Sequence, residues 1–337
     1  MWEERLRKES TFALSERPIM TNAVKGLSGT DQPKRKRWIS RWPGRLCLAI
    51  LTLGAVGIAT RLPQFIALER IRRLGGHVGW GIGGGLPPFY RFCLNFLGTP
   101  RSVVMSGARV KNSDMWVFRY LPGVSFVDLE GTHITGKGLR VLNAEHGIRH
   151  LVLVGNFGIT DTGLAVLHLS RLPQIVALVL TLSPKLTGAG LAGRHDCPTL
   201  RVLSVGACEK FSDQGLVAIR RFAHLRALVI SGTSVTNSGI RCLADLKKLR
   251  SIMLDNTGVT DDGLRLLSRV ATLRDISLSH DRITTRGLEY LRNLKQLRYV
   301  RLTGDGINKT EAKAILGAHV RVDLQEPPPG ALLMGGG

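Results

Sequence analysis

Two glycine-rich segments contain the residue types of nucleotide-binding loops. Gly131-Thr-His-Ile-Thr-Gly136-Lys137 imitates a phosphate-binding loop, but Gly138 stands where a Ser or Thr would have to ligate magnesium. Gly79, Gly81 and Gly84 have the spacing of a dinucleotide loop. However, no Val/Ile-rich strand precedes them, and Pro87-Pro88 follows where a helix should begin. We therefore expect neither segment to bind a nucleotide.

Histidines and cysteines are the other candidates for chemistry. His146 and His150 are four residues apart, but Gly147 separates them and His150 falls on an expected strand, so they cannot share a helix face around a metal. His195-Asp196-Cys197 has the residue types of an activated nucleophile, yet Cys197 opens a repeat at a structural position. The five cysteines form no CxxC pair. Serine elbows and suitably paired carboxylates are also missing, so we expect no enzymatic activity, no cofactor and no metal.

The elements that must position these residues are copies of one pattern. It returns nine times between Met105 and Leu302, at steps of 24 to 27 residues. The clearest copy runs Leu249-Arg-Ser-Ile252-Met-Leu254-Asp-Asn-Thr257-Gly-Val259-Thr260-Asp-Asp-Gly263-Leu264. A fixed period of this length is typical of a solenoid, in which each unit buries its apolar face only against its neighbours.

Each copy predicts a strand, a turn and a helix start. Two apolar columns, which begin at Val103 and Met105, are two residues apart and so share the buried face of a short strand. A small polar turn residue follows, and then a Ser or Thr suited to cap a helix. The recurring glycine, Gly263 in the clearest copy, indicates close approach between coils. Because helices are wider than the strand spacing, the sheet should curve with its strands on the concave side.

These residues resemble the leucine-rich repeat family over residues 100–324. The form L-x-x-L-x-L-x-x-[TNC]-x-[VI]-[TS]-D-x-G-L is similar to the cysteine-containing subclass, and its fullest copy runs from Cys197 through Cys208 to Gly215-Leu216. The resemblance implies an α/β solenoid of about nine repeats, with a parallel sheet on the concave side and helices on the convex side. It also implies that Cys197 and Cys208 are buried structural residues.

Composition divides the rest of the chain. Residues 1–45 lack apolar periodicity and are expected to be a basic disordered leader, and residues 325–337 a disordered tail. The uncharged run 46–60 is predicted to be a transmembrane or anchor helix, with a cleaved signal segment or a buried helix as alternatives. Residues 61–99 should form a linker and N-terminal cap. The basic flank before the run predicts a single-pass membrane protein whose N-terminus is cytoplasmic.

The strand residues that point away from the core should form a mildly apolar concave surface suited to a protein partner. We predict seven contact residues: Phe126, Val152, Val179, Val229, Met253, Tyr299 and Arg301. Few aromatic residues and several acids on this surface argue against nucleic acid.

A column of arginines follows the first apolar residue of most copies, in a chain whose net charge is +22. It forms a possible anion rim of Arg149, Arg201, Arg226, Arg250, Arg274 and Arg298. A solvated rim that covers the apolar floor beneath it is the other interpretation.

We therefore predict a membrane-anchored scaffold that binds a protein partner through the concave face, without catalysis. The layout also resembles bacterial membrane-anchored leucine-rich repeat proteins, which supports binding without naming a ligand. Two alternatives stay open. One is an F-box-like substrate-recruiting adapter of a ubiquitin ligase. The segment that begins at Leu62-Pro63 and includes Ile66, Ile71 and Leu74 resembles the opening of an F-box. The other is an anion- or polymer-binding surface on the arginine rim, for which binding should weaken steeply with salt.

Overall fold

A computed structural model describes residues 61–80, 100–107, 109–192, 197–279, 282–303 and 307–325. The chain forms two compact units, one of residues 1–66 with 80–98 and the other of residues 67–79 with 99–337. The second unit contains all nine repeats. The predicted leader, the predicted anchor at 46–60 and residues 326–337 lie outside the described residues. Within the described ranges, every helix is too short or too polar to cross a membrane.

One sheet runs through the described part of the second unit, and its eleven strands follow the order of the sequence. From β2 to β11, every neighbouring pair is parallel. The strands are β1 (His77–Trp80), β2 (Pro100–Val104), β3 (Phe126–Asp128), β4 (His150–Val152), β5 (Ala177–Val179), β6 (Val202–Ser204), β7 (Ala227–Val229), β8 (Ser251–Met253), β9 (Asp275–Leu278), β10 (Tyr299–Thr303) and β11 (Arg321–Gln325).

The two predicted apolar columns form the core. In the register of the sheet, Val103 pairs with Val127, and the column continues coil by coil to Val300 and Val322. Every predicted member of both columns is at most 2% exposed. Spacing of two along a strand places the columns on one face, where neighbouring coils bury them. The predicted solenoid is confirmed.

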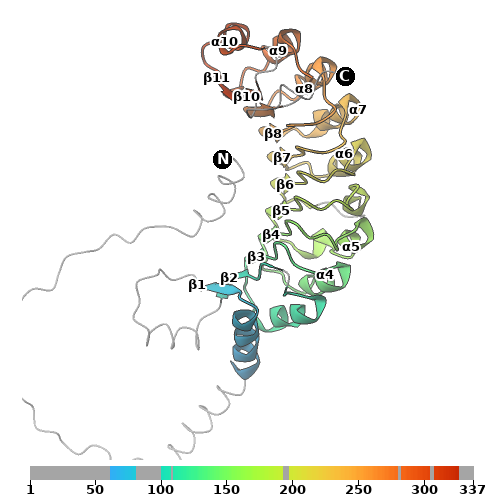
Figure 1. Ribbon diagram of the computed structural model, residues 1–337, viewed down its shortest axis with the longest axis vertical. Coiled ribbons are helices and arrows are strands. Elements are labelled where there is room, and N and C mark those ends of the chain that lie inside the picture. The colour runs from blue at the N-terminus through green and yellow to red at the C-terminus, as the bar shows by residue number, and fades with distance from the viewer. Residues whose placement is uncertain are drawn as a thin grey trace, which may run out of the picture. The chain divides into compact units, whose positions relative to one another are not determined.

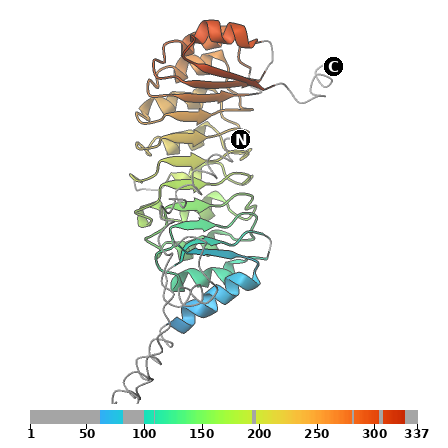
Figure 2. The same cartoon turned by 90° about the vertical axis from the view of Figure 1, so that its left-hand side faces the viewer.

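Short helical segments cover the other side of the coils. Figure 1 shows the strands on the concave side of this unit and the helices on its convex side, and Figure 2 shows the strands stacked one above another. The helical segments are η1 (Asn112–Tyr120), α4 (Gly136–Leu142), α5 (Asp161–Ala165), η2 (Leu169–Arg171), η3 (Ala189–Leu191), α6 (Asp213–Ile219), α7 (Asn237–Ile240), η4 (Arg241–Asp245), α8 (Asp261–Leu267), α9 (Thr285–Leu291) and α10 (Lys309–Leu316).

The predicted cap residues stand at the helix starts, but part of the capping comes from the preceding coil. Thr135, Thr160 and Thr236 accept a backbone N–H of their own helix, whereas Ser212, Thr260 and Thr284 make no such bond. The hydroxyl of Thr284 instead donates to the Asp261 carboxylate at 2.6 Å, and its backbone N–H donates to the same group at 2.9 Å. A carboxylate in one coil therefore fixes the helix start of the next.

The recurring glycine is explained by the same contact between coils. A Cβ added at Gly190 would lie 2.5 Å from the carbonyl oxygen of Asp161 in the coil before. At Gly263 and Gly287, an added Cβ would collide with Asn237 Oδ1 and Asp261 Oδ1. The predicted close approach is therefore confirmed, because only a residue without a Cβ leaves room for the side chain that caps the helix.

A helix at residues 61–73 precedes the first coil and ends at Gly75, whose φ is +83°. Ala67 and Ile71 are fully buried, so they form the buried face of this helix. Arg70 donates from Nε and Nη2 to Asp114 Oδ1, at 3.0 and 2.6 Å. Phe65 and Ile66 of the same helix do not join this face, because about half of each side chain is exposed.

Candidate interaction surface

The concave face has an open half in the early coils. Phe126, Val152 and Val179, three of the predicted contact residues, are each partly exposed on β3, β4 and β5. Val152 and Val179 are direct neighbours in the register. Residues that alternate with the core columns along a strand point away from the core, which leaves these apolar side chains facing solvent. They form a small apolar surface that a partner could cover.

An aromatic contact adds to this surface. Phe126 and His150 are register partners, with ring centroids 6.2 Å apart and planes tilted by 41°. Burial, and secondly the nearby Arg149 guanidinium, lower the pKa of His150 below its usual value of 6.5. The imidazole is therefore mostly neutral at pH 7, and it contributes to an aromatic surface there rather than to a charged one.

Two large exposed apolar side chains, which the sequence analysis did not single out, lie in the turns that follow these strands. Phe157 follows β4 and is 65% exposed, and Leu182 follows β5 and is 48% exposed. The turn of Leu182 is joined to the next coil by a backbone bond from Leu182 N to Gly206 O of 2.9 Å. The early coils therefore present apolar groups both on the sheet and at the C-terminal ends of its strands.

Leu182 occupies a position that requires the left-handed region. The equivalent residues of successive coils all have positive φ: Gly107, Gly131, Gly155, Leu182, Ala207, Gly232 and Asn256. The backbone N–H of each donates to the following coil, so the ladder imposes this conformation. Leu182 has a φ of +58°, which costs a residue with a Cβ about 1–2 kcal/mol. Glycine would avoid this cost, so the leucine is not explained by local stability.

The middle of the concave face is closed. Val229 and Met253, two further predicted contact residues, are only 4% and 6% exposed, although they lie outside the main core cluster. They are register partners, with Ser204 and Ser277 on either side. Side chains on strands about 4.8 Å apart cover one another at this spacing, which leaves little of these two for a partner.

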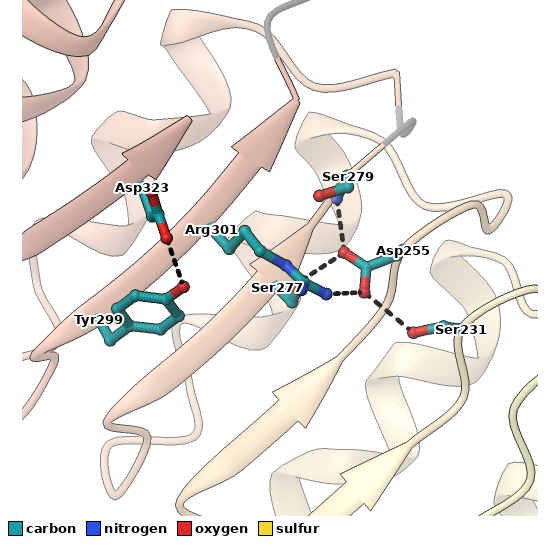
Figure 3. A network of polar contacts seen from close by, with 7 residues as sticks. All are labelled: Ser231, Asp255, Ser277, Ser279, Tyr299, Arg301 and Asp323. Carbon is teal, nitrogen blue, oxygen red and sulfur yellow. Dashed lines mark hydrogen bonds and ion pairs between the residues drawn. The ribbon is translucent and has the colours of Figure 1, made fainter. Parts of the chain in front are cut away.

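A part-buried ion pair lies beyond Met253 (Figure 3). Arg301 Nη2 donates to Asp255 Oδ2 at 2.8 Å, and the two side chains are 16% and 15% exposed. Asp255 also accepts from Ser231 Oγ at 3.2 Å, from the Ser279 backbone N–H at 2.8 Å and from the Ser277 hydroxyl. Arg301 Nε donates to Ser277 Oγ at 2.8 Å. The predicted contact residue Arg301 is thus bound within the sheet, where it joins three coils.

Tyr299, the last predicted contact residue, lies beside this network. Its hydroxyl donates to Asp323 Oδ2 at 3.2 Å. Burial, and then the Asp323 carboxylate, raise the pKa of Tyr299 above its usual value, so the phenol keeps its proton at physiological pH. The side chain is partly exposed and offers an aromatic surface at the far end of the sheet.

The predicted arginine column lies at the opposite ends of the strands from Leu182. Arg149, Arg226, Arg250 and Arg298 are exposed, and Arg201 and Arg274 are partly exposed. In the coil between Arg149 and Arg201 this position is Val176, so Arg149 stands apart from the others. Arg321 of the closing strand β11 pairs with Tyr299 rather than with Arg298, so it lies one residue beyond the column.

Cys197 and the phosphate-loop look-alike at 131–138 are parts of the repeat, whereas Gly81 and Gly84 of the dinucleotide-like loop lie outside the described residues. Cys197 and Cys208 are buried, and burial raises the pKa of both thiols, that of Cys208 to about 11. Such thiols stay protonated at pH 7 and are poor nucleophiles. Thr135, in the phosphate-loop look-alike, caps α4. Within the described ranges, no cluster of three or more His, Cys, Asp or Glu residues could hold a metal.

Comparisons with known proteins agree with this architecture. The leucine-rich repeat family model matches residues 196–219, a single repeat, and does not assign the cysteine-containing subclass. No curated protein matches the chain in sequence. The crystal structure of internalin C2 from Listeria monocytogenes is 23% identical and has a TM-score of 0.47, with 64% of this chain and 84% of that chain covered.

A second internalin (inlF) from the same organism is 20% identical and has a TM-score of 0.51. The match covers 67% of this chain and 62% of that chain, and it shows a common fold. The repeat match, the shared fold and the coil-by-coil register show that this chain has the leucine-rich repeat fold.

Proposed function

We propose that this protein binds a protein partner through the open half of its concave face, without catalysing a reaction. The contact surface consists of Phe126, Val152 and Val179 on the sheet, with Phe157 and Leu182 at the ends of the strands. Leucine-rich repeat folds are protein-interaction scaffolds, which supports the general role. Aromatic and aliphatic groups that are partly exposed and close together are typical of the anchor residues of an interface.

Leu182 is the observation that carries this proposal. It is a large exposed apolar residue held at a φ of +58°, in a column otherwise filled mainly by glycine. Strain that the surrounding structure maintains is often found where a side chain has a binding role. The rest of the predicted surface is assigned different roles. Tyr299 forms a second contact area, while Val229, Met253 and Arg301 support the sheet.

The membrane anchor remains a proposal that rests on the sequence of residues 46–60. It places the solenoid outside the cytoplasm, tethered through the helix at 61–73. Protease added to intact cells should digest the repeats, while a tag at the N-terminus stays protected. Recovery of the full chain in the soluble fraction, or protection of the repeats, would contradict this proposal.

Paired substitutions test the contact surface. Leu182→Asn with Val152→Ser should weaken binding of the partner more than tenfold, as expected when interface anchors are removed. Val217→Ser is the matched control, because Val217 is an apolar residue of α6 on the helical side and is 56% exposed. Partner binding should be unchanged in the control. Equal losses in the paired and control variants, with both folded, would refute the assigned surface.

A further inference from the structure

The arginine column continues through five successive coils. The backbone N–H of each arginine donates to the carbonyl of the one before, at 2.7 to 2.8 Å, from Arg201 to Arg298. The five are Arg201, Arg226, Arg250, Arg274 and Arg298, and we call them the basic rim. At a strand spacing of about 4.8 Å, the row is roughly 19 Å long.

Acidic residues are missing from the segments that carry this row. Each arginine ends a four-residue segment: 198–201, 223–226, 247–250, 271–274 and 295–298. Together these segments contain five arginines, three lysines and one histidine, but no Asp or Glu. Among the described residues, none of the five arginines forms an ion pair. Asp275, the acid next to Arg274 in sequence, already has a partner of its own.

The pKa of a nearby histidine and one buried arginine N–H both indicate that the positive charge of the rim is not neutralised. Lys248, followed by burial and by Arg201 and Arg226, lowers the pKa of His224, whose Nδ1 lies 3.0 Å from Lys248 Nζ. The Nε–H of Arg274 is buried and has no acceptor among the described residues. A row of like charges is unfavourable unless an anion neutralises it, so the rim should attract one.

The composition of the rim selects the kind of anion. Its segments contain no Phe, Tyr or Trp on which nucleic-acid bases could stack. Their leucines, such as Leu225 and Leu249, are at most 1% exposed, so no large aliphatic side chain of these segments is available to insert into a lipid surface. An extended polypeptide of about six residues spans roughly 20 Å and can carry carboxylates along the whole row.

We propose that the basic rim is a second binding surface, which takes an extended acidic polypeptide segment. This surface is separate from the apolar one around Leu182, because it lies at the opposite ends of the strands. Positive charge along the rim would capture the acidic segment quickly and hold it weakly, as is usual for exposed ion pairs.

Binding of a fluorescent polyglutamate peptide to the full chain tests the proposal. Replacing Arg226, Arg250 and Arg298 with glutamine should weaken binding about tenfold and make it less dependent on salt. All three side chains are exposed, so folding should be preserved, which a thermal melt checks. The matched control replaces Arg241, Arg286 and Arg292, three exposed arginines on the helical side, and should change binding less than twofold.

Equal losses in the two triple variants would overturn the proposal, because binding would then follow net charge alone. The basic residues 1–45 are present in both variants and cannot produce a difference between them. Oligothymidylate and phosphatidylserine vesicles serve as competing probes. If either binds more tightly than polyglutamate through the same three arginines, the acidic-polypeptide assignment is overturned. Leu182→Asn should not affect polyglutamate binding, so this surface and the apolar surface can fail independently.

Discussion

Replacing Arg301 with methionine should destabilise the far end of the sheet by about 2 kcal/mol. Removing one partner of a fully buried ion pair costs about 3–5 kcal/mol. Asp255 is 15% exposed and retains its bonds from Ser231, Ser277 and the Ser279 backbone, which reduces the loss. For a unit of this size, 1 kcal/mol corresponds to about 2–4 °C, so the melting temperature should fall by about 4–8 °C.

A double-mutant cycle measures the pair itself. Asp255→Asn alone should cost about 1 kcal/mol, and the double variant should cost less than the sum of the two single changes by about 1–2 kcal/mol. Arg298→Met is the control, since this exposed arginine directly precedes β10 and its loss should change stability by less than about 0.5 kcal/mol. Strict additivity of the two changes, measured by chemical denaturation, would refute the contact.

Three further changes test other parts of the structure. Leu182→Asn should leave the free energy of unfolding within about 1 kcal/mol of the parent, because relief of backbone strain offsets the lost apolar burial. Asn256 already has the same backbone conformation, so asparagine fits this position. A loss above about 2 kcal/mol in chemical denaturation would contradict the strain at Leu182. Burial raises the pKa of Glu145 from 4.5 to about 7, so the folded state binds an extra proton and stability falls as pH rises from 4.5 to 7. Glu145→Gln should therefore stabilise the protein at pH 8 and make no difference below pH 4.5. The expected gain at pH 8 is about 1 kcal/mol, a value reduced because the carboxyl is only half-buried. An equal effect at both pH values would refute the burial of Glu145. Arg70→Met should cost about 1–2 kcal/mol, because Asp114 is buried while Arg70 is 44% exposed, and a thermal shift below 1 °C would argue against the contact.

The solenoid could be predicted because its information is local and repeated. Spacing of two between apolar residues fixes a strand face, and the period then stacks those faces into one core. Thr284 could be predicted as a cap residue, but its bond to Asp261 of the preceding coil requires knowing how coils are aligned. The recurring glycines already indicated that neighbouring coils approach closely, and the structure identifies the atoms of the preceding coil that lie next to each glycine.

The interaction surface was harder to predict, because exposure depends on neighbours across strands. Val229 and Met253 point away from the core, as expected, yet adjacent side chains leave them little exposed area. Arg301 reaches Asp255, which is 46 residues earlier in sequence but only two strands away. An alignment of the repeats places Arg301 and Asp255 on nearby strands, close enough to pair, so the ion pair could have been predicted from the sequence. The same alignment places Leu182 at the position of Gly155, which would have identified it as unusual.

Site-specific photocrosslinking in intact cells tests the proposed interaction most directly. A photoreactive phenylalanine analogue at position 157 or 182 should yield a discrete crosslinked protein, and the crosslink at 157 should disappear when Val152→Ser and Leu182→Asn are added. The same analogue at Glu289, an exposed position of α9 on the helical side, should yield none. Crosslinks from position 289 to the same protein, or none from 157 and 182, would contradict the assignment of partner binding to the open half of the concave face.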